Sequence, residues 1–306
     1  MPPSLPDELP PDLPKVQWYP GHIAKAQKTL AERLALVDAV IEVADARIPD
    51  SSRFREARRY VGQKPHLLVY TKADLADPLL TRAWAAYHKA LLVDGRSGKG
   101  LPALKQRLAK EKAAIDARMA RRGRLPRPLR VMVLGLPNVG KSSLINRLAG
   151  ARKAQVGDKP GVTRAPGWIK LGRDLELLDT PGLVPPRLDD AGIAFRLALV
   201  GAIPLEAMDP LEVAKAAVHW LPRKCPAAHA AAGHPADLEA LALARGWRGP
   251  GGPDMERAGR AFLNELREGA YGQISWDGDP PQARPPRSSA TPQDEVPAAS
   301  PPLADM

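Results

Sequence analysis

Short apolar runs alternate with helical stretches between residues 24 and 178. The runs are rich in Val, Leu and Ile, which is typical of strands that are covered on both faces. We predict strands at residues 39–44, 66–70, 91–93, 130–134 and 175–178, and helices at residues 24–36, 102–119 and 141–149. Because strands that alternate with helices are typical of a wound sheet, this pattern predicts an α/β fold.

The pattern changes past about residue 200. Pro- and Gly-rich breaks separate three predicted helices there, at residues 205–221, 237–245 and 254–266, and no strong strand signal is present. We therefore expect an α/β domain at residues 15–200 and a small all-α domain at residues 201–276. Proline-rich segments without apolar periodicity predict a flexible leader at residues 1–14 and a disordered tail at residues 277–306.

A glycine-rich segment joins the predicted strand at residues 130–134 to the helix that follows. Gly135-Leu-Pro-Asn-Val-Gly140-Lys141-Ser142 fits the pattern G-x-x-x-x-G-K-[ST] of a phosphate loop (P-loop) at every fixed position. Backbone N–H groups would surround the phosphates, Lys141 would reach the β- and γ-phosphates, and Ser142 would bind Mg²⁺. The nucleotide contacts expected here are Asn138, Val139, Gly140, Lys141, Ser142 and Ser143.

Two further segments fit the magnesium and γ-phosphate sensors of such a site. Asp179-Thr-Pro-Gly182 follows the predicted strand at residues 175–178, so Asp179 would hold Mg²⁺ and Gly182 would donate its N–H to the γ-phosphate. The pattern Asp-x-x-Gly is weak alone, but its distance from the phosphate loop strengthens it. Thr163 lies between the two motifs, as the Mg²⁺-binding threonine of a first switch does.

Thr71-Lys72-Ala73-Asp74 follows another predicted strand and fits a base-reading segment. Asp74 could accept hydrogen bonds from N1 and N2 of guanine, which adenine cannot supply, and Lys72 would lay its alkyl stem over the base. The usual segment begins with Asn, and Thr71 reaches less far, which points to weaker binding of guanine. A backbone contact to guanine O6 is expected from Asp94-Gly95-Arg96, including Gly95 and Arg96, with Ser97 as the alternative.

The order of these segments is unusual. The base-reading segment precedes the phosphate loop by about 60 residues, whereas in an ordinary small GTPase it follows both switches. The order of base, phosphate, first switch and second switch is a circular permutation. The predicted fold class is therefore α/β, a circularly permuted P-loop GTPase sheet with a small C-terminal all-α domain.

Composition points to an intracellular protein with a polyanionic partner. The 306 residues carry 45 Lys and Arg against 34 Asp and Glu, a net charge of +11. Such a surplus suggests nucleic acid as the partner, and a GC-rich genome that favours Arg is the alternative explanation. A single Cys forms no internal disulfide, and every apolar run is shorter than the ~20 residues of a membrane span. We expect a cytoplasmic protein without a membrane partner.

Longer motifs make the chain resemble a known family. Trp18-Tyr-Pro-Gly-His22-Ile-Ala-Lys25-Ala, Val43-Ala-Asp45-Ala-Arg47-Ile-Pro49 and Val156-Gly-Asp-Lys-Pro160-Gly-Val-Thr163 accompany the phosphate loop and Asp179-Thr-Pro-Gly182. Over about residues 16–205 the chain resembles the circularly permuted GTPases called ribosome biogenesis GTPase A. The resemblance implies GTP hydrolysis with Mg²⁺, late assembly of the large (50S) ribosomal subunit, and a C-terminal helical RNA-binding domain. It makes the large-subunit precursor and its rRNA the expected partners, with a monomer away from the ribosome.

The end of the family's C-terminal domain has a counterpart in Gly272-Gln-Ile-Ser275-Trp. Separately, the basic run from Arg118 to Arg130 is a candidate rRNA contact. Contact with phosphates requires Arg density without sequence order, whereas the alternative is the solvated end of a linker helix. The RNA-contact candidates are Arg118, Arg121, Arg122, Arg124 and Arg127. Asp45-Ala-Arg47 is expected to support the end of its strand beneath the site.

The group that orients the attacking water is not the usual one. Leu183 and Val184 stand where many GTPases have Gln, and an apolar side chain cannot orient water. The resemblance implies that His22 does so, and the alternative is a helix-capping or surface histidine. It also implies that Asn138 helps to bind K⁺, whose charge stands where an arginine finger would. A rival function is an RNA-binding assembly scaffold with structural GTP and negligible turnover, which the intact Thr163 and Asp179 disfavour.

Overall fold

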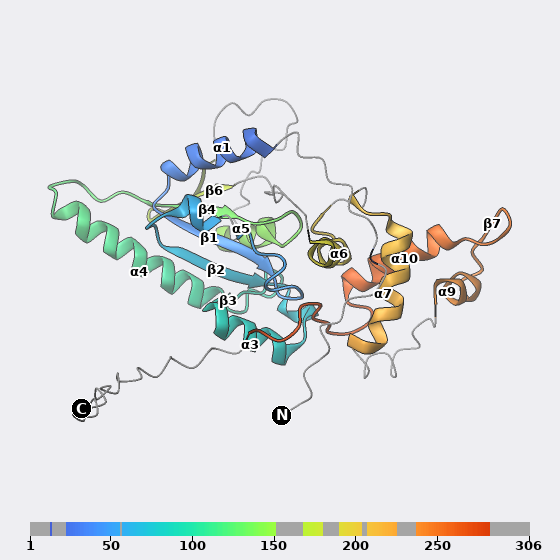
Figure 1. Cartoon of the computed structure of the whole chain (residues 1–306). Coiled ribbons are helices and arrows are strands. Elements are labelled where there is room, and N and C mark those ends of the chain that lie inside the picture. Colours follow the sequence, from blue (N-terminus) through green and yellow to red (C-terminus); the bar gives the residue numbers. More distant parts are fainter. Residues whose placement is uncertain are drawn as a thin grey trace, which may run out of the picture.

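The computed structural model describes most of the chain. It covers residues 13, 23–55, 57–150, 168–179, 190–203, 207–224 and 237–281, and the side chains at 23–28, 57–58, 179 and 224 are not described. Figure 1 shows a sheet with helices around it and a second group of helices beyond the carboxyl ends of its strands.

Within those ranges six strands form one sheet. The strands are β1 (Ala39–Asp45), β2 (His66–Thr71), β3 (Leu91–Leu92), β4 (Leu129–Leu134), β5 (Trp168–Leu171) and β6 (Leu175–Asp179). Their order is β3-β2-β1-β4-β6-β5, and all neighbours are parallel except β5, which is antiparallel to β6. Every residue of β1 is buried, as expected for a central strand covered on both faces. The predicted α/β sheet is confirmed, and its order is consistent with the permutation.

The register places the carboxyl ends of β2, β1 and β4 side by side. Asp45 at the end of β1 pairs with Thr71 at the end of β2, and Glu42 of β1 pairs with Leu134 at the end of β4. Loops that leave the carboxyl ends of neighbouring parallel strands meet at one edge of a sheet, where such folds bind their ligands. The base-reading segment and the phosphate loop therefore flank β1, although they are distant in sequence.

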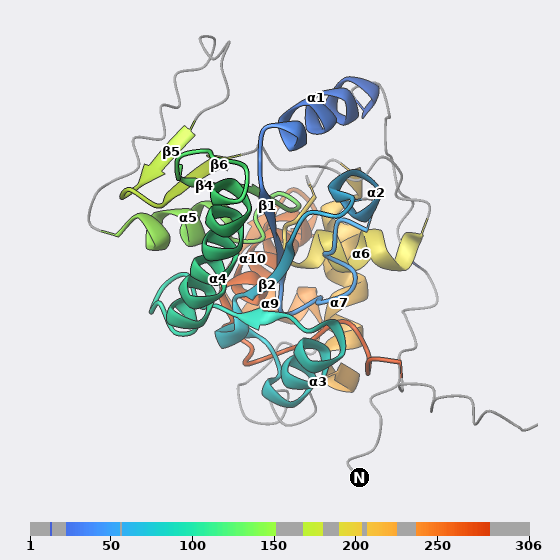
Figure 2. The same cartoon turned by 90° about the vertical axis from the view of Figure 1, so that its left-hand side faces the viewer.

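Helices surround the sheet and continue beyond it. The helices are α1 (Ile23–Ala35), α2 (Ala57–Val61), α3 (Pro78–His88), α4 (Leu101–Ala120), α5 (Lys141–Ala149), α6 (Ala191–Leu199), α7 (Pro210–Lys224), α9 (Leu238–Ala244) and α10 (Met255–Glu268), and η1 is a 3-10 turn (Ala73–Leu75). Figures 1 and 2 show α4 and α5 on one side of the sheet and α1 and α2 on the other. None of the described helices combines the length and apolar character needed to cross a membrane.

The long helix α4 has one apolar face. Gly100 in the left-handed region starts it, with a proline in its first turn, and it buries Leu101, Leu104, Leu108 and Ile115. That spacing places the four apolar side chains on one stripe against the sheet and leaves basic residues on the solvent side. The exposed arginines discussed below follow directly from this arrangement.

A helical region packs beyond the carboxyl ends of the strands. Helix α10 contacts α7 and α9, and α6 contacts α7 and α10, while a short hairpin links β7 (Arg248–Gly249) and β8 (Gly252–Pro253). Trp220 of α7 stacks near Phe195 of α6 and Trp276, with ring centroids 5.7 and 5.4 Å away. Helix α6 was not predicted from sequence because most of its residues are apolar and buried, so it lacks a polar face.

Candidate nucleotide-binding site

The phosphate loop packs closely against residues of β1 and β2. Gly135 has φ 153°, and a Cβ there would lie 2.3 Å from the carbonyl oxygen of Val43 in β1. Gly140 has φ 95° and caps α5, and a Cβ there would lie 3.0 Å from Thr71 Oγ1. Only glycine fits both positions without strain, so the two fixed glycines of the motif are explained by backbone geometry.

The first turn of α5 has the features of a phosphate cradle. Lys141 is 8% exposed, and its Nζ donates to the carbonyl oxygen of Leu136 across the loop at 2.7 Å. Ser142 and Ser143 are exposed, Val139 is buried, and the first turn carries no acidic residue. A helix N-terminus with this composition favours an anion, so these residues fit the phosphates of a nucleotide and Ser142 fits a Mg²⁺ ligand.

Lys72 joins the base-reading segment, to which it belongs, to the phosphate loop. Its backbone is left-handed, with φ 56°, and its Nζ lies 2.6 Å from the carbonyl oxygen of Asn138 and 3.0 Å from Asp45 Oδ2. Ala73 and Asp74 follow in the η1 turn, where Asp74 is exposed. Anchoring the ammonium at this point leaves the half-buried stem of Lys72 beside the site, which fits its predicted place over the base.

Thr71 connects the two halves of the site instead of facing solvent. It is 2% exposed, and its hydroxyl donates to the carbonyl oxygen of Val139 and lies 3.2 Å from that of Ala44. The hydroxyl thus ties β2 to the phosphate loop and to β1. Because Thr71 is buried and bonded to the phosphate loop, its short side chain affects the spacing between β2 and that loop. The predicted contact of Thr71 with the nucleotide stays a prediction.

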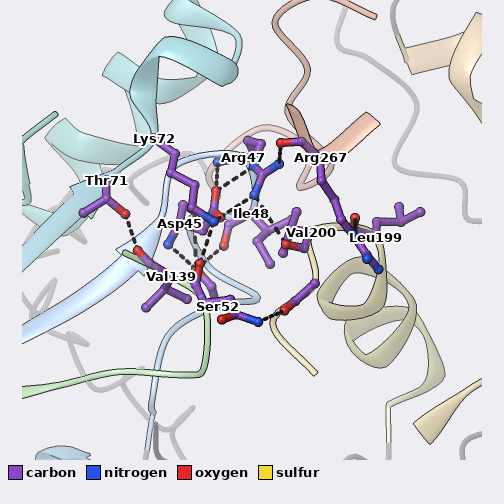
Figure 3. Close-up of polar contacts among 12 residues, drawn as sticks. Asp45, Arg47, Ile48, Ser52, Thr71, Lys72, Val139, Leu199, Val200 and Arg267 are labelled. Carbon is purple, nitrogen blue, oxygen red and sulfur yellow. Dashed lines mark hydrogen bonds and ion pairs between the residues drawn. The ribbon is translucent and has the colours of Figure 1, made fainter. Parts of the chain in front are cut away.

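A buried ion pair lies under the site (Figure 3). Asp45 is fully buried, and its carboxylate accepts hydrogen bonds from the backbone N, Nε and an Nη of Arg47 at 2.8–3.0 Å. Burial alone would raise the pKa of Asp45, but the Arg47 and Lys72 charges outweigh it and lower the pKa to about 2. The predicted supporting role of Asp45 and Arg47 is confirmed by these contacts.

Arg47 and Asn138 also connect the site to the helical region. The Arg47 guanidinium lies 3.0 Å from the carbonyl oxygen of Arg267 and 3.5 Å from that of Val200. Asn138 has φ 56°, and its Nδ2 donates to the carbonyl oxygen of Gly201 at 2.8 Å. Its predicted role in binding K⁺ stays a prediction, and the contact shows a second task for the same side chain.

The loop after β3 is closed by its own acid and lies beside α5. The Asp94 carboxylate accepts from the N–H groups of Arg96 at 2.7 Å and of Ser97 at 3.1 Å. A Cβ on Gly95 would lie 2.9 Å from Ser143 Cβ, which places this loop directly beside the first turn of α5. Since Asp94 engages the other two N–H groups, the predicted O6 contact narrows to Gly95, and Arg96 and Ser97 lose support as donors.

Several predicted residues lie outside the described part of the chain. His22, Thr163, Gly182 and Leu183 belong to this group. Asp179 ends β6 beside Val133 of β4, so its backbone lies one strand from the start of the phosphate loop, but its side chain is not described. These assignments stay predictions.

The basic run divides into exposed and paired arginines. Arg118, Arg121, Arg122 and Arg124 are exposed at the end of α4 and in the loop that follows. Arg127 instead forms two hydrogen bonds of 2.7 Å with the Asp38 carboxylate, beside the start of β1. Arg127 therefore has a structural partner, which weakens its candidacy as an RNA contact.

Sequence reasoning missed one component of the site. Residues 273–278 lie against the base-reading turn, and Gln273 Nε2 donates to the carbonyl oxygen of Asp74 at 3.0 Å. The tail was expected to begin at residue 277, but Asp277 is 4% exposed and accepts from the N–H of Asp50 at 2.8 Å. Asp277 therefore packs with the rest of the described chain, because its carboxylate has partners in the loop after β1.

Comparisons of sequence and of fold relate this chain to the same group of proteins. A family model described as 50S ribosome-binding GTPase matches residues 130–211. The protein named ribosome biogenesis GTPase A from Priestia megaterium is 38% identical over 288 residues, which cover 89% of this chain and 99% of that protein. Its namesake from Thermotoga maritima is 30% identical over 266 residues, 86% of this chain and 94% of that one. The crystal structure of GNP-bound YlqF from T. maritima matches with a TM-score of 0.59 and 25% identity, covering 82% and 97% of the two chains.

Proposed function

Since the chain belongs to the ribosome biogenesis GTPase A family, we propose that it is a GTP-hydrolysing switch that binds precursors of the large ribosomal subunit in the cytoplasm and promotes their late assembly. The observation that carries the proposal is the meeting of a guanine-reading turn and a phosphate loop across β1, with Thr71 and Lys72 tying one to the other. Both loops are needed for a guanine nucleotide, and the structure brings them together from opposite sides of one strand.

The residues around the phosphate loop assign a role to each part of the nucleotide. Lys141 and the N-terminus of α5 would hold the phosphates, and Asp74 would read the base. Ser142, Thr163 and Asp179 would hold Mg²⁺, which neutralises charge on the β- and γ-phosphates when it is bound. K⁺ beside Asn138 would add a further positive charge.

Contacts from the phosphate loop to the helical region favour a switch over a scaffold with structural GTP. The Asn138 side chain donates from the phosphate loop to the carbonyl oxygen of Gly201. The Arg47 side chain, which pairs with Asp45 beneath the loop, also contacts the carbonyl oxygens of Val200 and Arg267. A rearrangement of the phosphate loop therefore has a short path to the helices that we propose to bind rRNA. A switch requires a two-state element that both sites bias, and we propose that these contacts are part of it.

We expect slow GTP turnover by the protein alone and faster turnover with large-subunit precursor particles. Binding to those particles should be strongest with a non-hydrolysable GTP analogue and weaker with GDP, because the nucleotide biases the state that binds. Hydrolysis assays with and without particles, and co-sedimentation in both nucleotide states, measure the two effects. Equal particle binding in the two states would overturn the switch model. Negligible turnover under all conditions would instead support an RNA-binding scaffold with structural GTP.

The exposed arginines after α4 are the proposed rRNA contacts. Arg118, Arg121, Arg122 and Arg124 project from one end of the chain's longest described helix, and all four are exposed. Phosphate contacts release counterions, so they make binding depend steeply on salt.

Replacing these four arginines with glutamine should flatten the salt dependence of particle binding. Each lost phosphate contact lowers the slope of log K against log salt by about 0.7–0.9, so the combined change is roughly 3 if all four bind. Co-sedimentation across a salt series gives the slope. Arg127→Gln is the matched control, because its guanidinium pairs with Asp38, and the slope should stay unchanged. An unchanged slope in the fourfold variant would identify the run as a solvated linker.

A further inference from the structure

The end of the described chain returns from the helical region to the guanine-reading turn. Residues 273–278, here called the closing segment, follow α10, and Figure 1 shows this red part of the chain running back from the helices towards α3. Hydrogen bonds join the two segments: Gln273 Nε2 donates to Asp74 O at 3.0 Å, Ile274 N donates to Leu75 O at 3.0 Å, and Asp77 N donates to Ser275 Oγ at 3.1 Å. Three consecutive residues of the closing segment thus bond to the turn and to the residue that caps α3.

The second half of the closing segment is anchored to the loop after β1 and to α3. Trp276 N donates to the carbonyl oxygen of Arg47 at 2.7 Å. The buried Asp277 carboxylate accepts from the N–H groups of Asp50 at 2.8 Å and Ser51 at 3.0 Å. Trp84 of α3 donates its Nε1 to the carbonyl oxygen of Gly278 at 2.8 Å. These contacts fix the closing segment independently of the turn that it touches.

The guanine-reading turn has little support of its own. It is a 3-10 turn of three residues with no buried residue, entered through the left-handed Lys72. Leu75 N donates to Lys72 O at 3.0 Å within the turn. Short 3-10 turns have poor hydrogen-bond geometry, so the position of Asp74 depends on what lies beside it. The closing segment lies there, and Gly269 at the end of α10 packs so closely that a Cβ would lie 2.7 Å from Leu75 Cδ2.

We propose that the closing segment positions the guanine-reading turn, so that Gln273, Ile274 and Ser275 are positioning residues for base recognition. The proposal rests on the proposed function in one respect, because it takes Asp74 to be the residue that reads guanine. It makes the base contact depend on docking of α10 and the closing segment. The phosphate loop is instead held by Thr71 and Lys72, which precede the residues that the closing segment bonds to. A ligand that displaced the closing segment would loosen the base first and so promote nucleotide release.

The test compares GDP with IDP, whose hypoxanthine base lacks the 2-amino group. Asp74 can accept two hydrogen bonds from guanine and one from hypoxanthine. The variants are Gln273→Ala, Ser275→Ala and the pair combined, each in the full chain. Each lost hydrogen bond should weaken GDP binding about three- to tenfold, because one bond contributes roughly that factor. IDP binding should weaken less, so the dissociation constant of IDP divided by that of GDP should fall towards one.

Controls separate positioning from general damage. Gln106→Ala on the exposed face of α4 is the matched control and should leave both affinities unchanged. Thermal unfolding of each variant checks the fold. Equal weakening of GDP and IDP in the closing-segment variants, or no weakening of either, would overturn the positioning role.

The variant Asp74→Asn, measured in parallel, distinguishes this failure from failure of the proposed function. If Asp74→Asn lowers the ratio and the closing-segment variants do not, the closing segment has no positioning role although Asp74 reads the base. If Asp74→Asn keeps the wild-type ratio, the base-reading assignment is itself wrong, and the proposal falls with it.

Discussion

Replacing Asp74 with asparagine is expected to weaken GTP binding by about 10²–10⁴-fold and to make xanthine nucleotides the preferred ligands. The carboxylate would accept hydrogen bonds from N1 and N2 of guanine, and each bond to a charged group contributes about 1.5–3 kcal/mol. An asparagine amide can instead donate to the C2 oxygen of xanthine. The structure supports this assignment because Asp74 is exposed in the turn that follows β2, two residues after Lys72, whose ammonium contacts the phosphate loop.

Equilibrium binding of GTP, XTP and ATP to both proteins measures the change of preference. Asp77→Asn is the matched control, since Asp77 belongs to the same loop but its carboxylate caps α3 through the N–H groups of Leu79 and Leu80 at 2.8 Å. Asparagine is an equally good cap, so that variant should keep the guanine preference. Wild-type protein that binds ATP as well as GTP would show that the base-reading assignment is wrong.

Replacing His22 with alanine is expected to remove most of the particle-stimulated GTP hydrolysis, a loss of about 10²–10⁴-fold, which is the usual contribution of a positioned acid-base or water-orienting group. The apolar Leu183 stands where Gln would orient the water, and the family resemblance points to the Trp18–His22 segment as its replacement. GTP affinity should be unchanged because no nucleotide contact is lost. The variant should then stay bound to the particle in its GTP state.

Single-turnover hydrolysis with particles, together with GTP binding, tests the role of His22. His219→Ala is the control, because His219 is exposed on α7, where its Nδ1 lies 2.8 Å from the carbonyl oxygen of Lys215. Loss of GTP affinity in His22→Ala would instead mark a structural residue. Full stimulated activity would point to a catalytic group supplied by the ribosome.

The central strands of the sheet could be predicted from sequence because they are buried on both faces. The expected strand at residues 39–44 is β1 at Ala39–Asp45, and the one at residues 130–134 is β4 at Leu129–Leu134. The edge strand β5 was not predicted, because its residues are only partly buried and form no continuous apolar run. Helix α6 was not predicted for a different reason: it is apolar on nearly every side, so its sequence lacks the alternation of apolar and polar faces.

The candidate site was predictable where a motif fixes backbone geometry. A backbone neighbour excludes a Cβ at Gly135, and Gly140 combines a positive φ with a tight contact, so both positions require glycine and the spacing of the two glycines identifies the phosphate loop. The roles of Thr71 and Asp94 could not be read in this way, because each depends on which N–H or carbonyl group its side chain meets after folding. The contact between Gln273 and Asp74 joins residues 199 positions apart, and no local pattern signals it.

That separation also matters while the protein is being synthesised. The guanine-reading turn leaves the ribosome about 200 residues before the closing segment that bonds to it, and the phosphate loop also emerges earlier. Contacts between residues so far apart in sequence form late, because a long loop must be closed first. A nascent chain therefore holds its phosphate-binding elements before the partners of its base-reading turn exist. On the proposed role of the closing segment, selectivity for guanine is completed only when translation has passed residue 278.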